Sequence, residues 1–366
     1  MNPEALANAR QTSRAEGFDW DKLKDMVYRE RLAPLLSSVT YGSNLLPTDL
    51  AATIRHTYLR YAVHNARQLQ ELGDVISTFD NENIDIIVLK GAALAETIYA
   101  NIALRPMVDM DILIHRRDLE KAIPILNSLG YFSADLETHP GMITAYENEL
   151  LLHKVGAGDL DIALELHWSL LDSPHYQQKL RMDWFWRTAQ LSKIAGETAL
   201  VLGIEGQLLH LCSHISLHHA GGGMLWLHDV AEVLYRHESN VNWNTLMAKA
   251  EEYDLVLSLQ QVMNQVDKAW DLQLTTDMID KLNQLQPSDR EQQVFDWLNA
   301  SDRPVAHRFW VDLATSKSWK RRIAYAWQNL LPSAGYMRQR YNIKHSVFLP
   351  FYYPYRWLRG LLSVFQ

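Results

Sequence analysis

Apolar residues recur at three- and four-residue spacing in two stretches of the N-terminal quarter, residues 20–39 and 50–84. The segment TYGSNLLPTDL, rich in turn formers, separates them. This period is typical of amphipathic helices, and Gly, Asn and Pro between such stretches mark a turn. Residues 1–80 are therefore predicted to form a helical N-terminal subdomain.

The pattern changes in the middle of the chain, where short β-branched runs alternate with helical stretches. The run IDIIVLK (84–90) ends at Gly91 and predicts a strand, a glycine turn and a helix over AALAETIYAN. A second strand is predicted over 107–115. It is followed by a segment, 116–131, that is helical at least in its first turns despite Pro124 and is stopped by Gly130. A hairpin is predicted over 147–170, with its turn at VGAGD. Residues 81–200 are thus predicted to be a mixed α/β core.

The helical period returns from about Glu205 to Ala300. We expect residues 201–310 to form a C-terminal helical subdomain and residues 311–366 a basic aromatic segment. The fold class is α+β, a small mixed sheet flanked by N- and C-terminal helical subdomains. The helical stretches are residues 205–219, 224–237, 243–266 and 290–300.

Composition describes a globular chain of 366 residues, 48% hydrophobic, which is enough for two or three structural units. The single Cys212 excludes an intramolecular disulfide. The first twenty residues hold no apolar run that could act as a signal peptide, so a cytoplasmic location is expected.

The net charge of −8 is unevenly distributed, because residues 317–366 contain nine Lys and Arg and no Asp or Glu. The other residues therefore carry −17. Two interpretations stay open: a basic face packed on the acidic body, or a segment that meets an anionic membrane surface or nucleic acid. The apolar stretch 345–365 is interrupted by two prolines and two arginines, so an interfacial segment is a better interpretation than a membrane span.

Two carboxylates, Asp109 and Asp111, stand on one face of the strand predicted over 107–115, because side chains alternate between the faces of a strand. Like charges so close together repel unless a cation lies between them, and Mg²⁺ prefers carboxylate oxygens. The alternative is an acid pair that faces water. The hairpin strand offers further acids on one face, Asp161 and Glu165, with His167 beside them.

Lys90 and Gly91 lie where a predicted strand ends and a helix begins. Free backbone N–H groups and the helix dipole favour a phosphate at such a place, and Lys90 adds a positive charge. A plain turn is the alternative, since glycine is a general loop residue.

The ordered motifs L-K-G-A-A-L, R-P-x-x-D-x-D, L-G-Y and E-L-H-W together resemble the uncharacterised nucleotidyltransferase family of the DNA polymerase beta superfamily. The resemblance implies a small mixed sheet with Gly91 at the turn, Asp109 and Asp111 as metal ligands, and Glu165 as the third carboxylate. Two features depart from the superfamily pattern. The serine of its Gly-Ser motif is missing here, and Asp161 is a rival for the third carboxylate.

The resemblance implies Mg²⁺-dependent transfer of an NMP group from an NTP to a hydroxyl acceptor, with loss of pyrophosphate; Mn²⁺ is an alternative ion. The acceptor stays open between a small molecule, a peptide, a protein side chain and an RNA end. Lys90 and Arg105 would neutralise phosphate charge, although Arg105 could instead pair with the acidic cluster. His214 and Asp229 are expected to face the nucleotide cleft, with helix capping or core hydrogen bonding as the alternative.

Two other functional classes are kept. The chain could be a non-catalytic nucleotide-binding or scaffold protein with the same fold. It could also be a zinc-dependent hydrolase, because His210, His214 and His218 follow at i, i+4 and i+8 with His219 beside them. The glutamate of an H-E-x-x-H site is absent, so a polar stripe or a nucleotide-facing stripe is the better interpretation of these histidines.

Overall fold

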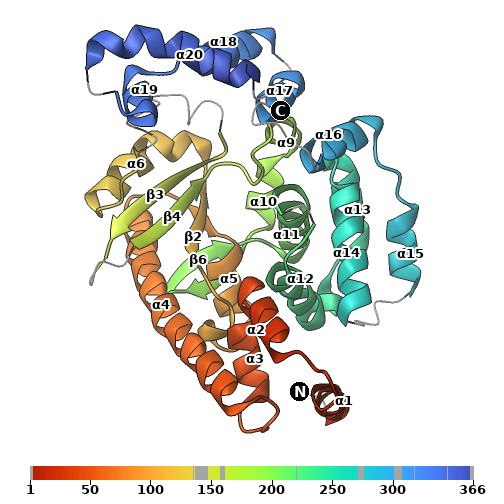
Figure 1. Cartoon of the computed structure of the whole chain (residues 1–366). Coiled ribbons are helices and arrows are strands. Elements are labelled where there is room, and N and C mark those ends of the chain that lie inside the picture. Colours follow the sequence, from red (N-terminus) through yellow and green to blue (C-terminus); the bar gives the residue numbers. More distant parts are fainter. Residues whose placement is uncertain are drawn as a thin grey trace.

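The structure is a computed structural model, and it describes residues 3–134, 136, 147–156, 161–219, 221–270, 276–300, 307–316, 318–343 and 345–362. Helices enclose a single sheet in the middle of the molecule (Figure 1). The N-terminal subdomain is helical, as predicted from its apolar period. Its helices are α1 (Pro3–Ser13), α2 (Trp20–Arg29), α3 (Ala33–Thr40) and the long α4 (Thr48–Asn81).

The sheet has six strands in the order β3-β4-β2-β1-β6-β5. Its centre is mixed, because β2 runs antiparallel to β1 and parallel to β4. The predicted hairpin is present as the antiparallel pair β3 and β4, although most of its turn lies outside the described residues. The strands are β1 (Ile86–Val88), β2 (Asp109–Ile114), β3 (Glu149–Val155), β4 (Asp161–His167), β5 (Gln190–Ile194) and β6 (Glu197–Val201).

The two faces of the sheet belong to different apolar cores. Met110, Ile112 and Ile114 of β2 join a core with Phe79 of α4, so this face packs on the long N-terminal helix. Leu113 of the same strand belongs to a second core, made largely by the C-terminal helices. Residues at odd positions in β2 therefore face the space between the sheet and those helices.

Shorter elements connect the strands. Pro124 lies inside α6, and this is consistent with the prediction that the helix begins despite it. The hairpin β5–β6 and the helices α9 and α10 had no counterpart in the sequence pattern. The connecting elements are α5 (Lys90–Thr97), η1 (Ile102–Leu104), η2 (Arg116–Asp118), α6 (Leu119–Ser128), α9 (Pro174–Lys179) and α10 (Met182–Thr188).

The C-terminal helices follow the predicted stretches with two differences. One is α15 (Thr276–Gln284), which lies between the stretches predicted over 243–266 and 290–300. Residues 243–266, expected as one stretch, form two helices because Asp254 between them has a left-handed backbone, with φ of 56°. The helices are α11 (Ile204–His218), α12 (Met224–His237), η3 (Glu238–Asn240), α13 (Trp243–Tyr253), α14 (Val256–Trp270), α15 (Thr276–Gln284) and α16 (Asp289–Asn299).

The helices that follow α17 (His307–Thr315) form a layer at one end of the molecule, coloured blue at the top of Figure 1, and α17 itself packs on α9 and α16. The elements of this layer are α18 (Trp319–Leu330), α19 (Ala334–Tyr341), η4 (Ser346–Phe348) and α20 (Leu349–Leu362). None of the helices in the described part of the chain has the length and apolarity needed to cross a membrane. The subdomain boundaries at residues 80, 200 and 310 stay a prediction.

Candidate active site

Asp111 and Glu165 are brought together by strand pairing. In the parallel pair of β2 and β4, Asp111 lies opposite Glu165, and Leu113 lies opposite His167. Side chains directly opposite each other on neighbouring strands project from the same face. Asp109 stands two residues earlier in β2, on the face that Asp111 shares. The carboxylates therefore gather on the face that is turned to the C-terminal helices.

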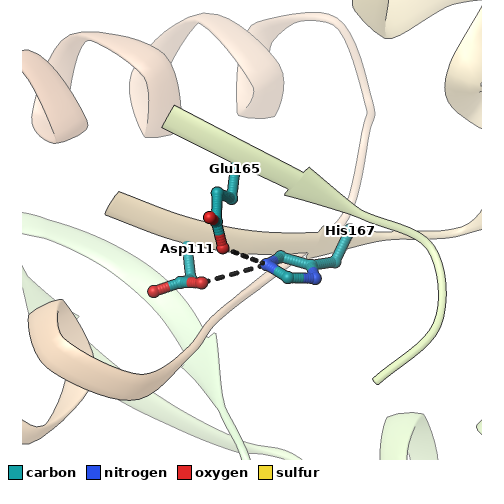
Figure 2. Close-up of side chains that lie close together, drawn as sticks. All are labelled: Asp111, Glu165 and His167. Carbon is teal, nitrogen blue, oxygen red and sulfur yellow. Dashed lines mark hydrogen bonds and ion pairs between the residues drawn. The ribbon is translucent and has the colours of Figure 1, made fainter. Parts of the chain in front are cut away.

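His167 joins the two carboxylates (Figure 2). Its Nε2 lies 3.0 Å from Asp111 Oδ1 and 3.4 Å from Glu165 Oε2. On the other side of the ring, Nδ1 lies 3.1 Å from Glu149 Oε2, close enough for an ion pair but without the alignment of a hydrogen bond. Glu149 lies opposite His167 in the β3–β4 pair, so a third strand contributes an acid.

Lys90 supplies a second positive charge at the first residue of α5. Its Nζ lies 2.6 Å from Asp111 Oδ1 and 3.5 Å from Glu165 Oε2. Its backbone is left-handed, with φ of 41°, a conformation that L residues rarely adopt and that is often found at functional sites. The prediction that placed Gly91 at the turn is corrected here, since Lys90 has the turn conformation.

Gly91 leaves little space for a side chain. A Cβ on Gly91 would lie 2.8 Å from Nη1 of Arg105 and 3.3 Å from Cγ of Met107. Both distances are shorter than ordinary van der Waals contacts. Gly91 therefore lets the start of α5 approach the segment that leads into β2.

Charge balance within this cluster shifts several pKa values. Burial alone would lower the pKa of His167 and of Lys90, but the neighbouring carboxylates outweigh it and raise both pKa values. Burial would raise the pKa of Asp111, yet Lys90 and His167 hold it well below its usual range. For Asp109, burial together with the charges of Asp111 and Glu165 outweighs Lys90 and Arg105 and raises the pKa to about 6. The charge of Asp109 is thus less compensated than the charge of Asp111.

The cluster contains a set of atoms suited to a metal ion. Within the described ranges, one group of three or more acidic, His or Cys residues could hold an ion: Asp111, Glu165 and His167, whose ligand atoms all lie within 4.8 Å of one another. Most ligand atoms of the cluster are carboxylate oxygens, which are the ligands that hard divalent cations prefer.

Comparison with known proteins identifies the family of the chain. The model of a family described as "Uncharacterised nucleotidyltransferase" matches residues 16–271. The chain belongs to this family. No curated protein matches the chain. A solved structure, an antigenic nucleotidyltransferase-like protein from Paracoccidioides brasiliensis, is 14% identical, with 61% of this chain and 96% of that chain covered and a TM-score of 0.35.

In this member of the nucleotidyltransferase family, Arg105 is paired with Asp229. Nη2 of Arg105 lies 2.8 Å from Oδ2 of Asp229, and the Tyr99 hydroxyl donates a hydrogen bond of 2.7 Å to Oδ1. Both charged side chains are buried, and Asp229 is fully so. Arg105 therefore pairs with α12 instead of with the acidic cluster, and a nucleotide contact by Arg105 or Asp229 stays a prediction.

Helix α11 carries the histidines that the sequence singled out. Burial, together with the charge of Lys90, holds the pKa of His210 and of His214 well below its usual range, so both rings are neutral at pH 7. His210 Nε2 is buried without a hydrogen-bond partner among the described residues. His214 pairs with His219 at 3.1 Å. The described α11 histidines do not form a metal-ligand group, and this disfavours the zinc-hydrolase alternative.

The rival third carboxylate lies elsewhere. Asp161 stands four residues before Glu165 in β4, is exposed, and pairs with His153 at 3.1 Å. Four residues of strand span about 13 Å. The structure brings Glu165 to Asp111 and leaves Asp161 outside the cluster.

Sequence reasoning assigned no role to His167 or Glu149. The alternation of the hairpin strand had placed His167 on the same face as Glu165, and this is the signal that could have found it. Glu149 could not have been found in that way, because its position opposite His167 depends on the register of the hairpin.

Proposed function

We propose that this family member is a divalent-metal-dependent nucleotidyltransferase that moves an NMP group from an NTP to a hydroxyl acceptor. The observation that carries the proposal is the pairing of Asp111 and Glu165 on adjacent strands, with Lys90 at the start of a helix above the same face. Acids and a cation in this arrangement suit a metal–triphosphate complex, in which both the ion and the phosphates need partners.

The donor set fits Mg²⁺ or Mn²⁺. Asp109, Asp111 and Glu165 would hold the ion through carboxylate oxygens, and His167 would orient two of them through its Nε2. When bound, the ion would polarise the acceptor hydroxyl and neutralise charge on the triphosphate.

The chemistry of the transfer is a single in-line exchange. The acceptor oxygen forms a bond to the α-phosphorus while the bond from that phosphorus to the bridging oxygen breaks, and the electron pair leaves with pyrophosphate. The hydroxyl proton passes to a carboxylate oxygen of the cluster. Lys90 would offset negative charge on the phosphates, and its place at the N-terminus of α5 adds backbone N–H groups on the same side.

A labelling experiment tests this proposal. The protein is incubated with each NTP labelled at the α-phosphate, Mg²⁺ and separate pools of small metabolites, peptides, proteins and RNA. We expect label to appear in one pool together with an equal amount of pyrophosphate. Asp111→Asn should abolish the transfer, whereas Asp161→Asn on the same strand is the matched control and should retain it. Transfer that persists in Asp111→Asn would contradict the proposal.

A non-catalytic scaffold is the second candidate, and one observation favours it. Lys90 and His167 already pair with Asp111 and Glu165, so the chain's own cations offset the charge of these two carboxylates. A scaffold of this kind would hold no metal and turn over no NTP. Absence of pyrophosphate release in every pool, by protein that binds no Mg²⁺, would favour the scaffold.

A further inference from the structure

The C-terminal layer, residues 318–362, exposes apolar stripes that amphipathic helices normally bury. In α18, Trp319, Ile323, Trp327 and Leu330 recur at helical spacing, and each is exposed, from 48% for Leu330 to 67% for Trp319. An apolar stripe at this period usually faces the core of the protein. This stripe faces solvent instead.

A second exposed stripe lies on α20. Phe351, Tyr355 and Leu358 follow at i, i+4 and i+7, with exposures of 72%, 50% and 59%. Val347 and Phe348, in the turn that leads into this helix, are exposed as well. Patches of exposed large apolar side chains mark interaction sites.

Specific contacts hold the helices of the C-terminal layer together. Trp357 of α20 donates a hydrogen bond of 2.7 Å to the carbonyl of Leu330 at the end of α18, so the two helices lie together. The Tyr353 hydroxyl donates to the carbonyl of Pro332, and Met337 of α19 is fully buried. The side chains that hold the layer together thus differ from those of the exposed stripes.

Charge indicates the kind of partner. Residues 317–366 carry nine basic and no acidic residues, whereas the other residues carry −17. Lys320, Arg338, Arg340 and Arg359 are exposed in the same layer as the apolar stripes. Cations beside exposed aromatic and aliphatic side chains are typical of helices that lie in the interface of an anionic membrane.

We propose that the C-terminal layer docks the protein on an anionic lipid surface. Trp319, Trp327 and Phe351 enter the headgroup region, and the surrounding Lys and Arg contact lipid phosphates and carboxylates. A second copy of the same layer would bring two strongly basic surfaces together, which repel each other. Nucleic acid would satisfy the cations and stack on the aromatic rings, but Ile323, Leu330 and Leu358 would stay in contact with water.

Flotation with lipid vesicles tests this docking. The full chain is mixed with vesicles of phosphatidylcholine, with or without phosphatidylserine, at low and high salt. We expect binding only with phosphatidylserine, and weaker binding at high salt. Trp327→Ser/Phe351→Ser should weaken partitioning roughly a hundredfold, since burying one large apolar side chain strengthens it about tenfold. Lys320→Ser/Arg340→Ser/Arg359→Ser should also weaken it roughly a hundredfold, since each cation contributes about fivefold.

Matched controls lie on the body of the protein. Tyr235 of α12 and Arg60 of α4 are exposed, and Tyr235→Ser/Arg60→Ser should bind vesicles as the wild type does. Circular dichroism checks that each variant is folded. The apolar substitutions and the basic substitutions test the docking separately, so one folded variant of the two is enough for the test. Equal binding to both vesicle types, or unchanged binding by a folded stripe variant, would overturn the proposal. Tighter binding to single-stranded RNA than to vesicles, or self-association that the stripe variant abolishes, would also overturn it.

Discussion

Asp229→Asn should destabilise the protein strongly, because it removes one charge of a buried ion pair. Asp229 has no exposed surface, and it accepts from Nη2 of Arg105 at 2.8 Å, from its Nε at 3.2 Å and from the Tyr99 hydroxyl at 2.7 Å. Asparagine has nearly the same volume and can still accept from Tyr99. The substitution therefore leaves the guanidinium of Arg105 buried with no compensating charge.

Breaking a buried pair by removal of one partner typically costs about 3–5 kcal/mol. For a protein of this size, each kcal/mol shifts the melting temperature by about 2–4 °C, so the expected decrease in Tm is on the order of 10 °C. Urea denaturation followed by circular dichroism gives the free energy of unfolding, and a thermal scan gives Tm. Asp74→Asn, on the exposed side of α4, is the matched control and should change stability by less than about 0.5 kcal/mol.

A double-mutant cycle identifies the cause of the loss. If the unpaired guanidinium is responsible, Asp229→Asn should cost much less in a background of Arg105→Met, where no guanidinium remains. A loss below about 1 kcal/mol for Asp229→Asn alone would show that the buried guanidinium does not depend on the charge of this carboxylate.

Three other substitutions test further buried contacts and the cluster itself. Gly91→Ala should cost about 1–3 kcal/mol in urea denaturation, since its Cβ would lie 2.8 Å from Nη1 of Arg105; an unchanged midpoint would show that the guanidinium moves freely. Glu291 has its pKa raised to about 7 by burial, so its folded form binds a proton more tightly than the unfolded form, and stability falls as pH rises from 4.5 to 7. Near pH 8, Glu291→Gln should therefore be more stable than the wild type by about 1–3 kcal/mol, and near pH 4 the free energies of unfolding of the two proteins should converge. If the two free energies changed with pH in parallel, the Glu291 carboxyl would not be the cause of the pH dependence. Glu165→Gln should lower the transfer rate by at least about a hundredfold and Asp161→Asn by less than about twofold; the reverse order would move the third carboxylate to Asp161.

Local pattern was sufficient to predict the elements that hold the cluster. The alternation of side chains along a strand placed Asp109 and Asp111 on one face of β2, and it placed Glu165 on one face of β4. The antiparallel hairpin was predicted from its turn. The parallel pairing of β2 with β4 could not be read from the pattern, because a period of two gives a face but no partner strand.

Other features depend on contacts between distant parts of the chain. The Arg105–Asp229 pair joins residues 124 positions apart. The sequence around either residue therefore gives no sign of the other. The left-handed backbone of Lys90 contradicts local preference, which would give that conformation to the neighbouring glycine. The hairpin β5–β6 was missed because exposed polar residues interrupt its short strands, with Gln190, Lys193 and Glu197 among them.

Titration calorimetry of NTP binding decides whether the acidic cluster is a metal–nucleotide site. Each NTP is titrated into the wild type with Mg²⁺ and with a chelator, and then into Asp109→Asn/Asp111→Asn. We expect at least one NTP to bind in a way that requires both the metal and the two aspartates, while circular dichroism shows the variant to be folded. Binding of equal strength without Mg²⁺ or without the aspartates, or no binding by the folded wild type, would contradict it.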